Sequence, residues 1–250
     1  MFRLDRTFAA LKYPNYRLWF AGQLASLVGT WMQSTAQGFL IFQLTDSPAY
    51  LGLVEFVSDI PSWVFMLYGG VIADRMPRRT LLVITQTAML VLAFILAALT
   101  FAGLVQPWQI VLLAFLLGVA HAFDTPARQA FVLEMIERED LGNAIALNAT
   151  MFQSAVVVGP AVAGITYALL GPAWCFTING ISFIAVIVAL LKMRLPPMVP
   201  RTHMTPTDAW VAQQLHEATP FGQHPRFLNT GKIIAFPVLN GLHHDYRHTA

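Results

Sequence analysis

The length of its uncharged segments constrains this chain more than any other feature of the sequence. Neither residues 80–123 nor residues 141–191 contain an Asp, Glu, Lys or Arg. An α-helix needs about 20 apolar residues to cross the hydrocarbon core of a bilayer, so each segment is long enough to cross it twice. Helix breakers interrupt both segments, at 103–107 and at Gly171-Pro172, which predicts two helical hairpins.

Two shorter segments nearer the N-terminus, 18–45 and 50–73, predict one crossing each. The first has an uncharged run about twice the usual core of a signal peptide and no small-residue cleavage site after it, so it is interpreted as a retained helix. Charged residues make up only 11% of the chain, against roughly 25% in soluble domains. The predicted fold class is therefore an all-α membrane protein with six transmembrane helices.

The composition changes abruptly after Pro196-Pro197. Six of the seven histidines lie beyond residue 200, where no apolar run is long enough to span a bilayer. The sequence therefore predicts two parts. Residues 1–196 form a six-helix transmembrane unit, and residues 197–250 form a poorly ordered, irregular cytoplasmic tail.

The positive charges are distributed unevenly between the two sides of these predicted crossings. All eleven Lys and Arg up to Arg194 lie in the N-terminus, in the second and fourth connections, or just after the sixth helix. The other three connections, 46–49, 103–107 and 171–173, contain none. Because cytoplasmic loops carry the excess of Lys and Arg, both ends of the six-helix unit are predicted to be cytoplasmic.

The first predicted helix carries a polar stripe. Its members follow one another at spacings of three, four, three and four residues, which places them on one face of a helix. They are Gln23, Ser26, Thr30, Gln33 and Gln37. Lipid cannot satisfy their hydrogen bonds, so the stripe faces either a water-filled cavity or other helices. Five polar residues in register favour the lining of a cavity.

Two carboxylates, Glu55 and Asp59, lie four residues apart on one face of the second predicted helix. Carboxylates inside a membrane are costly and mark ion or proton paths. We expect Asp59 and Glu55 to take part in proton coupling or substrate binding. The alternative for Glu55, about one turn from the outer surface, is simple hydration.

Several classes of chemistry find no support in the sequence. It has no Gly-x-Ser-x-Gly elbow and no Walker-type phosphate loop, so no enzyme is predicted. Cys175 is the single cysteine, and no metal-spaced cluster occurs in the six-helix region, so neither a metal nor another cofactor is expected. His121 is interpreted as structural. A net charge of +2 gives no reason to expect a nucleic-acid partner.

The second connection carries a motif with a strong resemblance. Residues 70–79 read Gly-Val-Ile-Ala-Asp-Arg-Met-Pro-Arg-Arg, in which the signature positions are Gly70, Asp74, Arg75, Arg78 and Arg79. The motif resembles the signature between helices 2 and 3 of the major facilitator superfamily. Residues 11–19, 29–34 and 123–130 resemble its enterobactin-exporter-like branch. The resemblance covers about residues 8–196 and implies transmembrane transport.

A second motif lies on the fifth predicted helix. Gly159, Pro160 and Gly164 stand in a segment that resembles the Gly-x-x-x-Gly-Pro-x-x-Gly-Gly motif of proton-coupled exporters. The resemblance also implies an inner gate, in which Asp74 lies at the inner end of helix 2 and Arg78 pairs with Asp124, near Arg128. The alternative is that these arginines only determine topology.

The tail resembles short pieces of an integrase-type transposase, at 210–215 with 225–228 and at 231–236 with 241–246. The acidic catalytic core of such a recombinase is absent. This pattern favours a transporter gene interrupted by an insertion-element remnant. The alternatives are a frameshifted tail and a genuine cytosolic extension.

These inferences lead to one functional prediction and one rival. The chain is predicted to be a truncated proton-coupled exporter of a small hydrophobic molecule or siderophore in a bacterial inner membrane. Its predicted partners are the lipid bilayer, the substrate, protons and, by self-association, a second copy. The rival is a nontransporting membrane remnant, or a scaffold that pairs with another chain.

Overall fold

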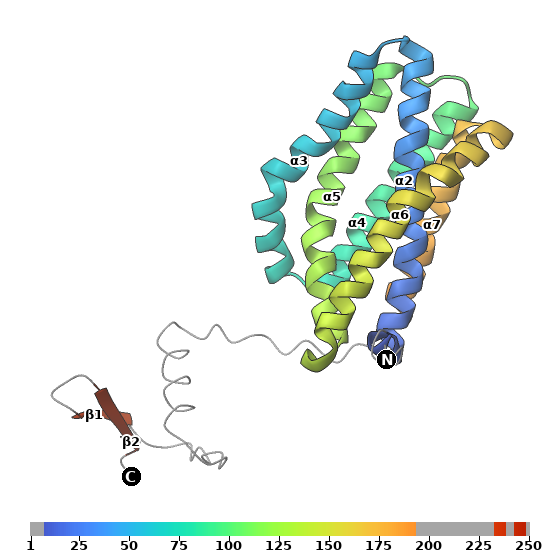
Figure 1. Ribbon diagram of the computed structural model, residues 1–250. Helices are drawn as coiled ribbons and strands as arrows, with labels where there is room; N and C mark the ends of the chain where they lie inside the picture. The colour runs from blue at the N-terminus through green and yellow to red at the C-terminus, as the bar shows by residue number, and fades with distance from the viewer. Residues whose placement is uncertain (1–7, 194–232, 239–242, 249–250) are drawn as a thin grey trace. The chain divides into compact units, whose positions relative to one another are not determined.

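The computed structural model describes residues 8–193, 233–238 and 243–248 (Figure 1). The chain divides into two units, Met1–Met198 and Val199–Ala250. The first contains six long helices: α2 (Pro14–Thr45), α3 (Pro48–Arg75), α4 (Arg78–Phe101), α5 (Pro107–Met135), α6 (Leu141–Leu170) and α7 (Pro172–Lys192). Short 3₁₀ turns, η1 (Ala9–Lys12) and η2 (Arg138–Asp140), precede α2 and α6.

The boundaries of these helices follow from proline and from left-handed backbone. A proline occupies the first turn of α2, α3, α5 and α7, where its missing N–H costs no helical hydrogen bond. The chain then reverses at Asp46, Gly103 and Gly171, which have φ angles of 49°, 68° and 89°. The hairpin breaks at 103–107 and Gly171-Pro172 are therefore confirmed, as is the all-α membrane fold.

By length and composition, four helices of the described chain could cross a membrane: α4, α5, α6 and α7. The remaining two long helices contain the predicted polar groups, the stripe in α2 and Glu55 with Asp59 in α3. Those side chains lower the hydropathy of the two helices. Crossings by α2 and α3 therefore stay predictions.

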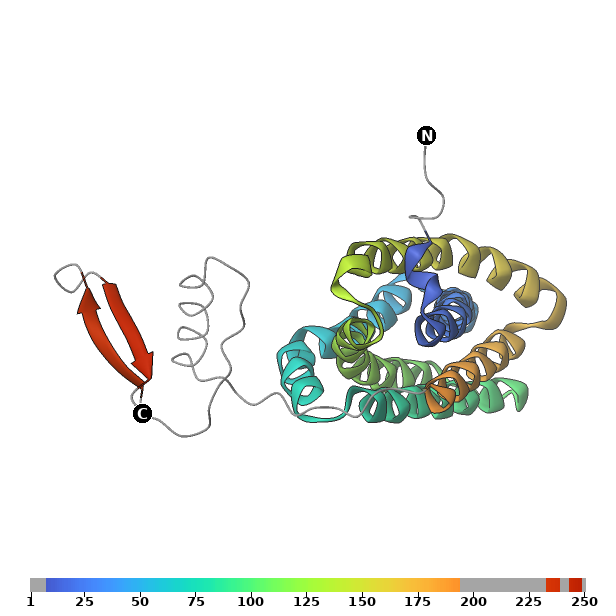
Figure 2. The same cartoon turned by 90° about the horizontal axis from the view of Figure 1, so that it is seen from below.

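Most contacts between the six long helices join helices that are not consecutive in the sequence. The closest pairs are α3 with α5, α4 with α7, and α2 with both α7 and α6. Viewed along the helices, α2 lies in the interior of the unit (Figure 2). If α2, α3 and α4 are matched in order with α5, α6 and α7, the contact between α2 and α6 corresponds to the contact between α5 and α3. Such internal repeats are typical of transporter folds.

Glycines lie where these pairs come closest. A Cβ added to Gly118 of α5 would collide with the Ser58 carbonyl oxygen of α3. A Cβ added to Gly159 of α6 would lie 3.0 Å from the Val28 carbonyl oxygen and 3.1 Å from the Met32 nitrogen of α2. Small residues allow membrane helices to approach closely. The backbones of α3 and α5, and those of α2 and α6, are therefore in direct contact at these glycines.

The second unit contains two described strands, β1 (Ile233–Val238) and β2 (His243–His248). They pair antiparallel, with Ile233 opposite His248 and Val238 opposite His243. The sequence predicts an irregular tail, whereas these two segments form a ladder. Ile233, Ile234 and Phe236 favour extended backbone, which accounts for the difference. The transposase-like segment at 210–215 lies outside the described residues.

Candidate functional site

The polar stripe of α2 lies inside the six-helix unit. Gln23, Ser26, Gln33 and Gln37 are only 1–6% exposed. The Thr30 hydroxyl donates to the Ser26 carbonyl at 2.9 Å, within the same helix. For Gln33 the structure shows a contact between helices, because its side-chain oxygen accepts a hydrogen bond from the Asn179 amide of α7 at 2.8 Å. A cavity-lining role of the stripe stays a prediction.

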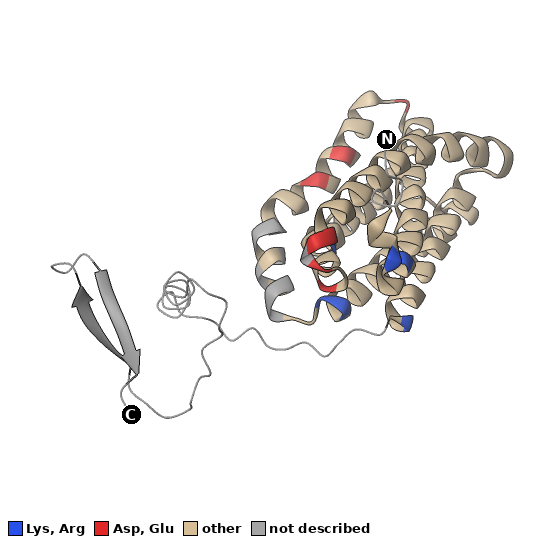
Figure 3. Ribbon diagram, turned by 60° about the horizontal axis from the view of Figure 1, so that its bottom comes forward, with Lys and Arg blue, Asp and Glu red and all other residues tan. Residues whose placement is uncertain are grey.

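The two carboxylates of α3 lie in a different environment. Glu55 and Asp59 are exposed on α3, and no hydrogen bond or ion pair joins either of them to the described part of the chain. Figure 3 shows acidic positions in the first half of α3, away from the blue basic positions. Phe56 and Trp63 share this exposed side, at 65% and 84% exposure. Charged groups are too costly in lipid for this face to meet hydrocarbon, so it requires water or a protein partner.

The arginines of the second connection join α4 to the ends of two other helices. The Arg78 guanidinium donates to the Glu134 carboxylate at 2.8 Å and to the Ala130 carbonyl at 3.1 Å, both on α5. Arg79 donates to the Leu191 carbonyl of α7 at 2.8 Å. Carbonyls at the C-terminal end of a helix attract cations, so both contacts are electrostatically favourable. The side chains of Asp74 and Arg75 lie outside what the structure describes, and Gly70 has open space beside it.

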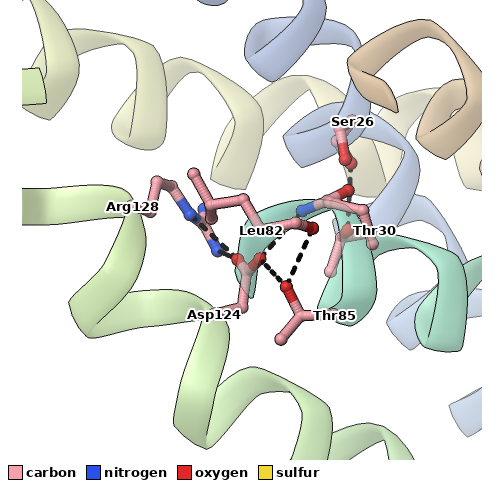
Figure 4. A network of polar contacts seen from close by, with 7 residues as sticks. Ser26, Thr30, Leu82, Thr85, Asp124 and Arg128 are labelled. Atoms are coloured by element: carbon pink, nitrogen blue, oxygen red, sulfur yellow. Dashed lines mark hydrogen bonds and ion pairs between the residues drawn. The ribbon is translucent and has the colours of Figure 1, made fainter. Parts of the chain in front are cut away.

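Among the contacts of the described residues, none joins Arg78 to Asp124 as predicted. Asp124 is fully buried and accepts hydrogen bonds from Thr85 at 2.8 Å, from Gln86 at 3.1 Å, and from Arg128 at 2.5 and 3.1 Å (Figure 4). Asp124 lies ten residues before Glu134 on α5, which is about 15 Å along a helix. Arg78 begins α4 at the level of Glu134, so the deeper carboxylate is out of its reach. Glu134 is not predicted from the motif, although its distance from Asp124 along α5 places it at the level of Arg78.

The residues of the exporter motif on α6 differ in their surroundings. Gly159 lies against α2 as described above, and Pro160 stands inside the helix. Gly164 has no neighbour within 4 Å of an added Cβ. A shallow hollow of about 600 Å³ extends along the exposed side of α6, lined by Ala149, Thr150, Gln153, Ser154, Val157 and Val158. Gly159 contributes a packing contact to α2, and the exporter role of the motif stays a prediction.

A strap formed by η1 fastens the start of α2 to the start of α6. The Asp140 carboxylate lies 2.6 Å from the Lys12 ammonium and accepts a hydrogen bond from the Tyr13 hydroxyl at 2.8 Å. The Ala10 amide donates to the Asn143 side chain at 2.9 Å. The hydrogen bonds from Lys12 and Tyr13 hold the pKa of Asp140 below its usual value. The strap is therefore a charge-assisted contact at neutral pH.

Comparison with known proteins agrees with this architecture. Over residues 5–212 the chain matches the profile of the family described as transmembrane secretion effector. The match passes residue 196, the boundary predicted from composition. The chain is similar to the staphyloferrin A transporter of Staphylococcus aureus, with 26% identity over 70% of this chain and 44% of that protein.

Two further relatives have comparable similarity. The macrolide efflux protein A of Streptococcus pyogenes is 23% identical over 75% of this chain and 47% of that protein. The enterobactin exporter of Shigella boydii is 25% identical over 76% of this chain and 46% of that protein. The chain thus spans about half the length of the curated relatives it matches. Since the family profile covers most of the sequence, this chain belongs to the transmembrane secretion effector family of major facilitator superfamily transporters.

Proposed function

We propose that this chain is the N-terminal six-helix half of a proton-coupled exporter of a small hydrophobic molecule or siderophore in a bacterial inner membrane. The observation that carries the proposal is the exposed pair Glu55 and Asp59 on α3, without a polar partner among the described residues. Major facilitators bind their substrates between two six-helix halves. A second half that covered this face would place both carboxylates in that path.

The chemistry of the carboxylates supports proton coupling, the names of the relatives support the class of substrate, and the charged connections support the direction of transport. A carboxylate in a low-dielectric path binds and releases protons reversibly, because burial opposes its charge. Relatives of this chain are described as a staphyloferrin A transporter, a macrolide efflux protein and an enterobactin exporter. The positive connections support cytoplasmic termini, so that export would run from the side of Arg78 and Arg79 to the side of Asp46.

The test uses proteoliposomes with an imposed proton gradient and a panel of lipophilic dyes, a macrolide and siderophores. The chain is reconstituted alone and together with the second half of the macrolide efflux protein A. We expect gradient-driven export only from the completed transporter, because alternating access requires two halves that rock around a shared site. A completed transporter that folds but moves no member of the panel would refute the exporter proposal.

The role of the carboxylates is tested in the same assay. Asp59→Asn should abolish gradient-driven export, and Glu55→Gln should reduce it less, because Glu55 lies nearer the outer end of α3. Asp46→Asn is the matched control, since Asp46 is an exposed carboxylate at the outer end of α2 in a left-handed conformation that asparagine also adopts. Export that persists in Asp59→Asn would assign that carboxylate no part in coupling.

We infer that the part of the tail beyond the family match, which ends at residue 212, derives from an inserted element, on the strength of the resemblance of the predicted tail at 197–250 to transposase segments. Sequencing the DNA beyond codon 197 tests this inference. A second transporter half in another reading frame would support an interrupted or frameshifted gene. An uninterrupted sequence of related transporters that carries the same tail would support a genuine cytosolic extension instead.

A further inference from the structure

A layer of polar side chains crosses the six-helix unit between two apolar clusters. The inner cluster joins three helices and includes Trp19 of α2, Leu82 of α4 and Ala127 of α5. Residues three or four positions apart lie one turn apart on the same face of a helix. One turn further outward, these faces therefore carry the polar residues Gln23, Gln86 and Asp124. A turn beyond them a second apolar cluster begins, which contains Met89, Ala93, Ala120 and Phe183. Apolar packing thus bounds the polar layer on both sides.

Two amide oxygens in this layer have no hydrogen-bond partner among the described residues. Gln23 and Gln86 are each 1% exposed, and the side-chain oxygen of each is unpaired. The orientation of Gln86 is fixed, because its amide nitrogen donates to the Asp124 carboxylate at 3.1 Å and an ionised carboxylate can only accept. Trp19, also 1% exposed, adds an indole N–H that is likewise unpaired. Buried polar atoms are costly without hydrogen bonds, so these three require a further group between them.

The unpaired atoms, one donor and two acceptors, indicate the chemical class of that group. A water molecule can accept from the indole and donate to each amide oxygen, and buried waters make about three hydrogen bonds. A metal cation would meet the indole N–H and the nearby Arg128 guanidinium, which donates to Asp124. An anion would face the Asp124 carboxylate and the two amide oxygens. Water, which is neutral and both donates and accepts, therefore fits this set.

The polar stripe of α2 reaches this layer without a direct hydrogen bond to it. Ser26 is 2% exposed and faces the same interior as Thr85 and Asp124 (Figure 4). Thr85 and Gln86 of α4 both donate to Asp124 of α5, so these two helices are joined directly. Within the described part of the chain, no hydrogen bond joins the stripe to this group of side chains. A ligand shared by α2 and α4 would supply that link.

We propose that a buried water molecule binds between Trp19, Gln23 and Gln86 and links the stripe of α2 to α4 and α5. The water accepts the hydrogen bond of the indole and donates one to each amide oxygen. Through Gln86 it connects α2 to the Asp124 carboxylate. The site lies within the six-helix unit, so it depends neither on a second half nor on transport.

The first measurement detects this water in the wild-type chain. Brief X-ray irradiation of the chain in nanodiscs splits water into hydroxyl radicals, which oxidise side chains within reach. A side chain shielded from solvent is oxidised only where a bound water lies beside it, and mass spectrometry locates the product. Trp19 should be oxidised several-fold faster than Tyr16. Tyr16 is the matched control, because it is also 1% exposed but its hydroxyl donates directly to the Ala144 carbonyl at 3.1 Å. Equal rates at the two residues would overturn the proposal.

The second measurement removes one partner of the water. Methionine is close to glutamine in volume but lacks the amide oxygen, so Gln23→Met tests whether that oxygen is paired. Unfolding on heating is followed by reaction of the buried Cys175 thiol. With the water bound, Tm should fall by about 2–4 °C, the effect of one hydrogen bond in a chain of this size. Removal of an oxygen without any partner would instead leave Tm unchanged or raise it, and either result would overturn the proposal.

A double-mutant cycle tests whether the two amides share the water. The Tm losses of Gln23→Met and Gln86→Met should be non-additive, with the Tm of the double variant about 2–4 °C above the value that their sum predicts. Gln33→Met is the matched control, since Gln33 accepts directly from Asn179. Its loss should add to that of Gln86→Met. Additive losses in the first pair would show that the two oxygens share no ligand.

The identity of the ligand is tested by exchange of the salt. Tm should be the same in sodium chloride and in choline chloride, because the site binds no ion. A Tm that depends on the alkali cation would assign the site to a metal ion and overturn the proposal. If Gln23→Met fails to fold, the oxidation of Trp19 in the wild-type chain decides the question.

Discussion

Replacement of Asp124 by asparagine tests the corrected pairing at the α4–α5 contact. Asp124 is fully buried and the Arg128 side chain is 16% exposed, so the substitution leaves a largely buried cation without its counterion. Loss of one partner of a buried ion pair costs about 3–5 kcal/mol. Asparagine keeps an oxygen that can accept from Thr85 or Gln86, which favours the lower end, about 3 kcal/mol. For a domain of this size that corresponds to a fall in Tm of roughly 6–12 °C.

The chain provides its own reporter for this measurement. Cys175 is the single cysteine and is buried in α7, so a thiol-reactive dye reports unfolding on heating. Double-mutant cycles then identify the true partners. Arg128→Gln should cost little more once Asp124→Asn is present, whereas Arg78→Gln should couple with Glu134→Gln.

The refuting result concerns the pair predicted from the motif. Arg78→Gln and Asp124→Asn should be additive within about 0.5 kcal/mol, because they share no partner. A coupling of more than about 1 kcal/mol between them would show that Arg78 does reach Asp124. A loss of less than about 1 kcal/mol in Asp124→Asn would contradict the estimate from burial.

Three further predictions concern topology, packing and pH. Reporters fused at Ser47 and Gly171 should report the outside and those in the two positively charged connections the cytoplasm; a cytoplasmic signal at either outer site contradicts six crossings. Gly159→Leu should destabilise the unit by about 1–3 kcal/mol in the thiol assay, because the side chain would separate α2 from α6; unchanged stability would show that the two backbones are not in contact. The contacts of Asp140 with Lys12 and Tyr13 should persist above the usual Asp140 pKa of 3.8 and weaken as pH falls through its lowered pKa. The weakening is measured as faster hydrogen exchange of the Ala10 amide. No change below pH 3, or weakening already near pH 6, would contradict the assigned cause.

Features set by one dominant physical effect can be predicted from this sequence, whereas contacts that depend on how deep a residue lies in the membrane cannot. Hydrophobic length and the breakers at Gly103 and Gly171 predict the hairpins, because nothing else competes with them. The partner of Arg78 depends on how far each carboxylate lies along α5, and spacing within the motif does not contain that information. The stripe of α2 is likewise predicted as a face, but its neighbour, Asn179, lies 146 residues away from Gln33.

The long reach of that last contact has a consequence for biogenesis. Of the six long helices, α2 is made first, yet its main neighbours, α6 and α7, are made last. Until α7 has been made, the side chain of Gln33 lacks the amide that it contacts in the finished unit. Hydrocarbon would penalise that unpaired group by several kcal/mol. The side-chain amide of Gln33 must therefore be hydrated or contact the insertion machinery while some 130 further residues are synthesised, at about 5–20 residues per second. Among the six long helices, α2 is therefore the one that must be kept from hydrocarbon for the longest time during synthesis.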